Sequence, residues 1–183
     1  MVREMVIEKY NEDWKKQFYQ VKKILEKKLT KIVKIEHVGS TAIEGMCGKP
    51  IIDITIIINK KSDFNRLKKE LESIDYFHKG DQGIDGREVF ERENSHQYKI
   101  LDTVNHHLYV CTQDNEELEK EILFRNFLNK DEKTRKEYYD IKMEIIGKIG
   151  NKNQKSYVSM KSAKYSWFFE DVIKKAKMEK NKN

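Results

Sequence analysis

The chain has 183 residues, a formal net charge of +6, 38% hydrophobic residues and 37% charged residues. This length predicts one domain that is large enough to bury a core of its own. No apolar run approaches the ~20 residues needed to span a bilayer, and the first residues lack the apolar core of a signal peptide. Two cysteines are too few for a disulfide framework, so we expect free thiols in a cytoplasmic protein that does not enter a membrane.

The positive charge is concentrated at the carboxyl end of the chain. Residues 151–183 contain nine lysines against three acidic residues, whereas the first 150 residues are neutral overall. Such an excess could attract phosphates or nucleic acid, although a solvated lysine-rich tail also explains it. The sequence has no basic stripe interleaved with aromatic residues and no recognisable nucleic-acid module, so nucleic acid is not the partner that we expect.

The first part of the chain is predicted to contain both helices and strands. A helix over residues 12–29 places its apolar residues at helical spacing, with Asn11 as its cap. Residues 50–59 are apolar on both sides of Asp53, which predicts a strand in the interior of its sheet. The other expected elements are an arm over 5–10, strands over 32–38, 76–77, 88–90, 98–101 and 106–112, a turn with a short helix over 39–48 capped by Ser40, and a helix over 64–74.

The character of the sequence changes after the strand that ends at residue 112. Three further helices are expected, over residues 116–128, 133–149 and 154–177. The whole pattern predicts an α+β fold, with helices packed on a small mixed sheet and a helical C-terminal half. We expect a single domain over residues 1–183, made of an α/β part (about 1–115), a helical part (about 116–177) and a basic tail (178–183).

One segment combines features of a phosphate site. His37-Val38-Gly39-Ser40-Thr41 is followed, thirteen residues after Ser40, by Asp53 in the apolar strand. A Gly-Ser pair where a loop enters a helix can offer free backbone N–H groups and a hydroxyl to a phosphate. A carboxylate on the next strand could then hold Mg²⁺ beside that phosphate.

The acidic residue of this strand has two interpretations. A carboxylate in so apolar a strand is costly unless it is paired, protonated or bound to metal, so Asp53 is either a metal ligand or a structural hydrogen-bonding residue. Nucleotidyltransferases usually place a second carboxylate two residues later, on the same face of the strand. Here that position is Thr55, which offers one neutral oxygen, and a two-metal mechanism cannot be assumed.

The strand over 106–112 carries adjacent histidines on opposite faces. His107 shares its face with the hydroxyl of Tyr109, whereas His106 shares the other face with Leu108, so one of the two histidines must face the core or a helix layer. We therefore favour His107 as the site residue, as a general acid or base, a phosphate donor or a metal ligand. The alternative is a histidine that only fills a packing position.

Several cations are candidates for binding a phosphate. Arg87 ends a loop with three glycines over residues 80–86, which could cover a ligand, although a simple hairpin turn is the alternative. Lys49 lies just before the predicted strand that contains Asp53. Lys161 and Lys164 follow Tyr157 on one face of the last helix and could reach over the site, or they could be ordinary solvated residues.

Together these segments resemble the GrpB family over roughly residues 5 to 173. The segments that carry the resemblance are His37 to Gly45, Lys49 to Ile54, Gly83 to Arg87 with Phe90, His106 to Val110, Leu123 to Leu128, and Tyr138 to Lys142. The resemblance implies a nucleotidyltransferase-like fold in a small cytosolic protein. A similar domain is fused behind dephospho-CoA kinase in some bacteria, which implies a link to nucleotide or coenzyme A metabolism.

The resemblance also implies roles for particular residues. Gly39 and Ser40 would form the phosphate loop, with Asp53 as the metal-binding acid. Members of the family often carry a histidine where this chain has Tyr109, which weakens the case for a histidine pair that binds metal. The family's late Tyr-x-x-x-Lys corresponds to Tyr157 and Lys161, but the following aromatic residues come late enough that Lys164 remains an alternative.

Three hypotheses follow from the sequence. The leading one is a protein that binds a nucleotide or another phosphate-bearing ligand, with Mg²⁺-dependent nucleotidyl transfer as its reaction. In that case Gly39, Ser40 and Thr41 hold phosphate, while Asp53 and His107 act in catalysis. The second is a non-catalytic ligand-binding or regulatory module. The third is a nucleic-acid-associated protein that uses its lysine-rich last helix.

Overall fold

The computed structural model describes residues 7–93, 95–149 and 154–181. The side chains of residues 149 and 154–165 are not among those described, so Lys161 and Lys164 lie outside the described side chains. None of the helices in the described ranges is long and apolar enough to cross a membrane. The arm expected over residues 5–10 is described from residue 7 onward and makes one antiparallel bridge, between Glu8 and Gly48.

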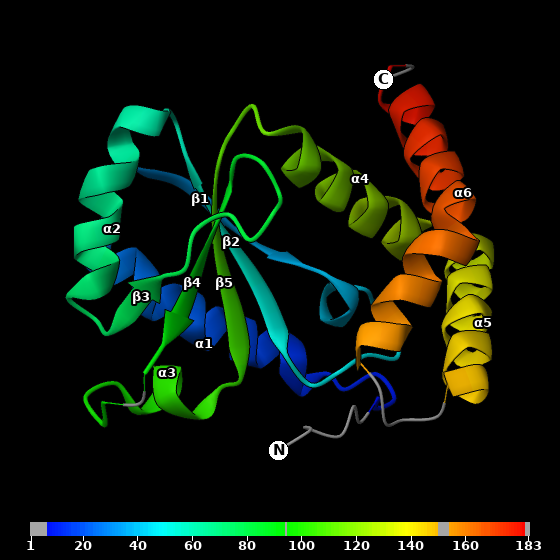
Figure 1. The fold of residues 1–183 in the computed structure, drawn as a ribbon, viewed down its shortest axis with the longest axis horizontal. Helices are drawn as coiled ribbons and strands as arrows, with labels where there is room; N and C mark the ends of the chain where they lie inside the picture. The colour runs from blue at the N-terminus through cyan, green and yellow to red at the C-terminus, as the bar shows by residue number, and fades with distance from the viewer. Residues whose placement is uncertain (1–6, 94, 150–153, 182–183) are drawn as a thin grey trace.

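A five-stranded mixed sheet forms the centre of the molecule (Figure 1). Its strands are β1 (Ile32–Val38), β2 (Ile52–Ile58), β3 (Tyr76–His78), β4 (Arg87–Arg92) and β5 (His106–Thr112), in the spatial order β1-β2-β5-β4-β3. The β2 and β5 strands are parallel, and the other three pairings are antiparallel. The strand that carries Asp53 is therefore interior to the sheet, as its apolar sequence predicted.

Three helices pack on one face of the sheet and enclose the main core. They are α1 (Asp13–Lys28), α2 (Phe64–Glu72) and α3 (Lys99–Thr103). The β2 residues Ile52, Ile54 and Ile56 point into this core together with Leu108 of β5. The side chain of Asn11 accepts a hydrogen bond from the backbone N–H of Asp13 at 2.9 Å, which fixes the start of α1.

The other face of the sheet meets the helical C-terminal part of the chain. This part contains α4 (Glu116–Lys130), α5 (Glu132–Ile149) and α6 (Gln154–Lys180), which lie together beyond the sheet in Figure 1. Ile57 and Cys111 pack against Leu118 of α4, and a second core joins the three helices to Ile43 and Met46. The predicted α+β architecture with a helical C-terminal region is confirmed, and α6 continues to Lys180, three residues into the stretch expected to be a tail.

Two local predictions were wrong. Residues 98–101 were expected to be a strand, but Lys99–Thr103 form the short helix α3, because a run of four residues cannot distinguish a strand period from one helical turn. Ser40 was expected to cap a helix. Instead Gly39 occupies the cap position of the 3-10 turn η1 (Ser40–Ala42), and the Ser40 hydroxyl bonds to a distant lysine.

The main core predicts a clear response to truncation. Leu25 of α1 is fully buried, so Leu25→Ala removes buried apolar surface and leaves a cavity. We expect the free energy of unfolding to fall by about 2–5 kcal/mol. Urea denaturation followed by circular dichroism measures the change. Lys16→Ala on the exposed side of the same helix is the control, and equal losses in the two variants would contradict the assigned packing.

Candidate functional site

The turn after β1 presses its backbone against Asp53. Val38 at the end of β1 pairs with Asp53 of β2, and Gly39 follows at once with φ of +74°. A Cβ atom added at Gly39 would lie 2.3 Å from Oδ2 of Asp53, which is closer than any real contact. Only glycine fits here, because both its backbone conformation and the space beside the carboxylate exclude a side chain.

Asp53 forms a hydrogen-bonded pair with the favoured histidine. The parallel register sets Asp53 beside His107, and Nδ1 of His107 lies 2.9 Å from Oδ1 of Asp53. Because a carboxylate only accepts, Nδ1 carries the hydrogen, which leaves Nε2 of His107 for another partner. The His107 side chain is 51% exposed and that of Asp53 is 28% exposed, so the pair can be reached from solvent.

The neighbouring histidine, His106, has both ring nitrogens hydrogen-bonded inside the protein. Nδ1 of His106 bonds to the carbonyl oxygen of Val104 at 2.7 Å, and its Nε2 accepts from the Tyr76 hydroxyl at 2.6 Å. Burial lowers the pKa of His106, which keeps the ring neutral inside the core. Both ring nitrogens are therefore used within the protein.

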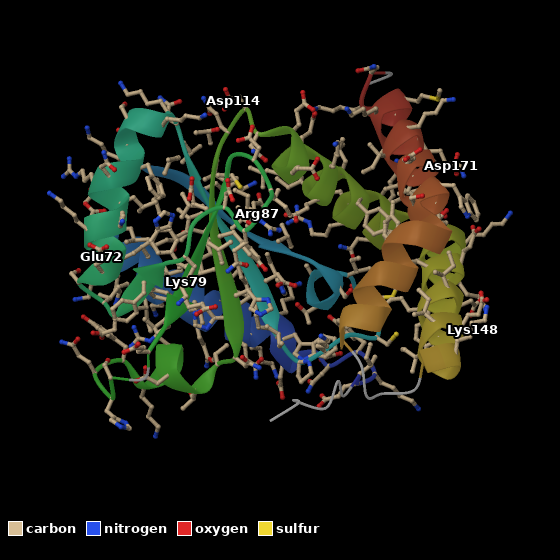
Figure 2. All side chains as sticks on the ribbon, in the orientation of Figure 1. Glu72, Lys79, Arg87, Asp114, Lys148 and Asp171 are labelled. Carbon is tan, nitrogen blue, oxygen red and sulfur yellow. The ribbon has the colours of Figure 1, made fainter. Side chains whose placement is uncertain are left out.

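A polar strip continues from Asp53 across the same face of the sheet. Burial, and after it the neighbouring Asp53 carboxylate, raise the pKa of Tyr109. The guanidinium carbon of Arg87 lies 4.6 Å from the centre of the Tyr109 ring. Arg87 is at the centre of the molecule in Figure 2, near the start of α4. Nε of Arg87 and Oγ1 of Thr55 are both buried with no hydrogen-bond partner among the described residues.

The hydroxyl of Ser40 is held from the helical part of the chain. Nζ of Lys142 in α5 donates to Oγ of Ser40 at 2.8 Å and also to the carbonyl oxygen of Cys47. The Lys142 side chain is 2% exposed, and Nζ lies 5.4 Å from the centre of the Tyr138 ring. Lys142 was not among the site residues predicted from the sequence. The available signal was a lysine at an apolar position of a helix, between the buried Ile141 and Ile145.

Thr41 faces inward, not toward the surface of the turn. Its hydroxyl lies 2.9 Å from Nε2 of His37 and donates to the carbonyl oxygen of Ile51 at 3.3 Å. His37 is stacked on Phe18 with ring centres 4.8 Å apart, and burial lowers its pKa to about 4. Thr41 and His37 therefore make hydrogen bonds inside the protein beside the Gly-Ser turn, and Thr41 is 4% exposed.

Further cations surround the turn. NH1 of Arg125 in α4 donates to the carbonyl oxygen of His37 and to Oε2 of Glu36, each at 2.6 Å. Burial alone would raise the pKa of Glu36, but hydrogen bonds from Lys34 and Arg125 lower it overall. Burial lowers the pKa of Lys49, and the nearby Asp53 carboxylate opposes that shift. Lys49 thus lies within the electrostatic reach of Asp53.

A cavity of about 710 Å³ opens from the Gly-Ser turn toward α4 and α6. Its lining includes Gly39 and Ser40 and aromatic rings from all three C-terminal helices. The lining residues are Gly39, Ser40, Ile43, Glu117, Lys120, Glu121, Phe124, Arg125, Tyr138, Phe169, Glu170, Ile173, Lys174, Lys177, Met178 and Asn181. A slightly larger hollow of about 780 Å³ lies beside Val33 and Phe127 and includes none of the predicted site residues.

The donor set limits which metal could bind. Among residues 7–93, 95–149 and 154–181, no group of three His, Cys, Asp or Glu side chains could hold a metal ion. Thr55 is buried at the position of a second acid, and Glu36 is engaged by two cations. Mg²⁺ commonly takes one or two carboxylates and completes its shell with waters and ligand phosphates. Asp53 fits that arrangement as a single carboxylate, but not a two-metal centre.

The structure brings part of the predicted site together. Gly39, Asp53 and His107 are in contact, and Ser40 links them to the cavity. Arg87 stacks on Tyr109, whose pKa is raised in part by the Asp53 carboxylate. These features define an α+β protein with an exposed Asp-His pair beside a glycine turn that opens into a helix-walled cavity.

Comparison with known proteins places this arrangement in a family. A family model described as GrpB protein matches residues 4–175, so the chain belongs to the GrpB family, as the sequence motifs predicted. The Glutamate-rich protein GrpB of Alkalihalophilus pseudofirmus is 32% identical over 160 residues, which cover 86% of this chain and 90% of that protein. YqkA of Bacillus subtilis is 32% identical over 146 residues, covering 78% of this chain but only 40% of YqkA.

Solved structures give a consistent picture of the fold. The crystal structure of the conserved protein GrpB from Enterococcus faecalis superimposes with a TM-score of 0.75 at 26% identity, covering 93% of this chain and 98% of that chain. A Cid1 poly(U) polymerase structure gives a TM-score of 0.49 at 12% identity, over 66% of this chain and 38% of that chain. We draw no conclusion from a likeness of that size.

The contact between Gly39 and Asp53 predicts a loss of stability on substitution. In Gly39→Ala the new Cβ meets the carboxylate and the backbone keeps a left-handed conformation. We expect the free energy of unfolding to fall by roughly 1–3 kcal/mol or more, measured by urea denaturation. Gly83→Ala is a matched control, because Gly83 also has positive φ but a Cβ there meets nothing within 4 Å. If both variants lose the same amount, the contact with Asp53 contributes nothing.

The buried His37 predicts a pH dependence of stability. Its pKa is about 4 in the folded protein against an ordinary 6.5, so the unfolded chain binds the extra proton more readily between these values. The contribution of neutral His37 is therefore complete above about pH 6.5 and is lost as the pH falls toward 4. We expect a shallower decline of the unfolding free energy between pH 7 and 4.5 in His37→Gln than in the wild type. Parallel curves from urea titrations at several pH values would rule this out.

Proposed function

We propose that the protein binds a nucleotide-like ligand in the 710 Å³ cavity, with the phosphates at the Gly39-Ser40 turn and the base among the aromatic rings of the helical part. The observation that carries this proposal is the continuity of the cavity. One end is a glycine-serine turn, and the wall is formed by Phe124, Tyr138 and Phe169. A cavity of this volume has the size that small-molecule sites usually have.

The phosphate end offers the groups that an anion requires. The Gly39 backbone is free of a side chain, Ser40 supplies a hydroxyl, and the ammonium of Lys142 lies directly behind Ser40. Arg125 also lines the cavity, although its NH1 is engaged with His37 and Glu36. Hydrogen bonds between charged donors and phosphate oxygens are about twice as strong as neutral ones.

The aromatic end favours a flat, unsaturated group. Phe124 and Phe169 lie 5.0 Å apart between ring centres, and Tyr138 is edge-on to Phe124 at 5.2 Å. A base stacked on an aromatic side chain contributes about 1–3 kcal/mol. Lys120, Lys174 and Lys177 line the same cavity together with Arg125, and Glu117, Glu121 and Glu170 line it as well, so the cationic side chains exceed the acidic ones by one. The aromatic rings are therefore the main support for a base at this end of the cavity.

The reaction that this site would support is nucleotidyl transfer. The observation in its favour is the contact of Asp53 with Gly39, since a metal held by Asp53 would lie next to a phosphate at the turn. Bound Mg²⁺ would neutralise charge on the phosphates there. His107 would orient the acceptor or take its proton through Nε2. Because Thr55 supplies no second carboxylate, a ligand-binding or regulatory module without catalysis is the alternative.

A binding experiment tests the ligand and the reaction separately. Wild-type protein is titrated by calorimetry with ATP, GTP, CTP, UTP and coenzyme A, each with and without Mg²⁺, and thermal shifts are recorded in parallel. We expect at least one of these ligands to bind and Ser40→Ala to weaken it on the order of tenfold. A catalytic site predicts that Mg²⁺ strengthens binding and that Asp53→Asn abolishes this strengthening, whereas a binding module predicts affinity that ignores both.

Two matched variants locate the ligand. Phe169→Ala alters the proposed cavity, and Val33→Ala alters the other hollow. Loss of affinity only in Phe169→Ala supports the proposed cavity. Loss only in Val33→Ala, or no binding of any tested ligand to the wild type, would rule out the proposal.

A further inference from the structure

Lys142 is a charged side chain in the second core of the protein. It lies on α5 with Tyr138, Ile141 and Ile145, all of which are buried. Neighbouring positions on this face of the helix are filled by apolar side chains, so packing alone does not call for an ammonium group here. Burial of a charge is unfavourable unless polar partners surround it. The partners include the hydroxyl of Ser40 and the carbonyl oxygen of Cys47, which both belong to the segment around the Gly-Ser turn.

The direction of the hydrogen bond between Lys142 and Ser40 is fixed by chemistry. An ammonium group has three donors and no acceptor, so Oγ of Ser40 must accept from Nζ of Lys142 over their 2.8 Å separation. The hydrogen of the Ser40 hydroxyl must then point to a different acceptor. Ser40 is half-buried and lines the 710 Å³ cavity, which is where a ligand would offer such an acceptor.

We propose that Lys142 is a positioning residue that turns the Ser40 hydroxyl into a donor for an anionic group, of the phosphate class, bound at the cavity. This inference rests on the proposed function and deepens it, because it makes the helical part of the chain a component of the anion site. Lys142 acts through Ser40 and through its charge, without itself touching the ligand. Its second hydrogen bond, to Cys47, holds the two ends of the segment from Ser40 to Cys47 on one ammonium group.

Variants that change the charge of Lys142 distinguish this positioning role from a role in packing alone. Lys142→Met keeps a long, unbranched side chain but removes both the charge and the donor. Lys142→Arg keeps the charge and the donors. Lys136→Met removes the same charge from an exposed position of the same helix, where Lys136 is 74% exposed and paired with Asp140.

Affinity for two probes is measured by calorimetry for each variant. The probes are ATP, which carries phosphates, and adenosine, which does not. We expect Lys142→Met to weaken ATP binding on the order of tenfold relative to wild type, with adenosine affinity unchanged. Lys142→Arg should retain most of the ATP affinity, and Lys136→Met should match the wild type. Urea denaturation of each variant gives the folded fraction used to correct these values.

A double-mutant cycle with Ser40→Ala keeps the inference testable if Lys142→Met folds poorly. If Lys142 acts through Ser40, then in the Ser40→Ala background Lys142→Gln should change ATP affinity less than it does in the wild-type background. Fully additive effects, or equal losses for ATP and adenosine, would overturn the role of Lys142 while leaving the proposed function intact. Absence of ATP binding to the wild type at millimolar concentration would instead remove ATP as the ligand, and the inference on Ser40 would fail with it.

Discussion

The site depends on the absence of one side chain. Gly39 leaves room for its backbone to pass against the carboxylate of Asp53, and a Cβ atom there would lie 2.3 Å from the carboxylate oxygen. This contact joins the end of β1 to β2, and the parallel pairing of β2 with β5 then brings His107 to the same carboxylate. The turn, the acid and the histidine are thus placed by backbone geometry before any long side chain is considered.

The sheet divides the chemistry of the molecule between its two faces. Alternate residues of β2 point to the main core, where Ile54 and its neighbours pack against α1 and α2. The residues between them form the polar strip of Asp53 and Thr55, which continues through Tyr109 and Arg87 toward α4. One face therefore stabilises the fold, while the other presents ionisable groups to the helical part of the chain.

The sequence predicted what depends on short-range patterns. The interior position of the Asp53 strand followed from its apolar run, and the placement of His106 and His107 on opposite faces followed from alternation. Strand register does not follow from such patterns, so the Asp53–His107 hydrogen bond could not be predicted. Lys142 was missed because its partner Ser40 lies 102 residues earlier in the chain. The short helix α3 was wrongly predicted as a strand, since four residues do not define a period.

The bond between Lys142 and Ser40 also has a consequence for the order of folding. Contacts between residues far apart in the chain form late, because the loop between them must first lose its conformational freedom. During synthesis the Gly-Ser turn emerges long before α5. Until α5 packs against the turn, the Ser40 hydroxyl cannot bond to the ammonium group of Lys142. The sheet can therefore reach its topology before the turn has its final arrangement, and the proposed anion site is among the last features of the molecule to form.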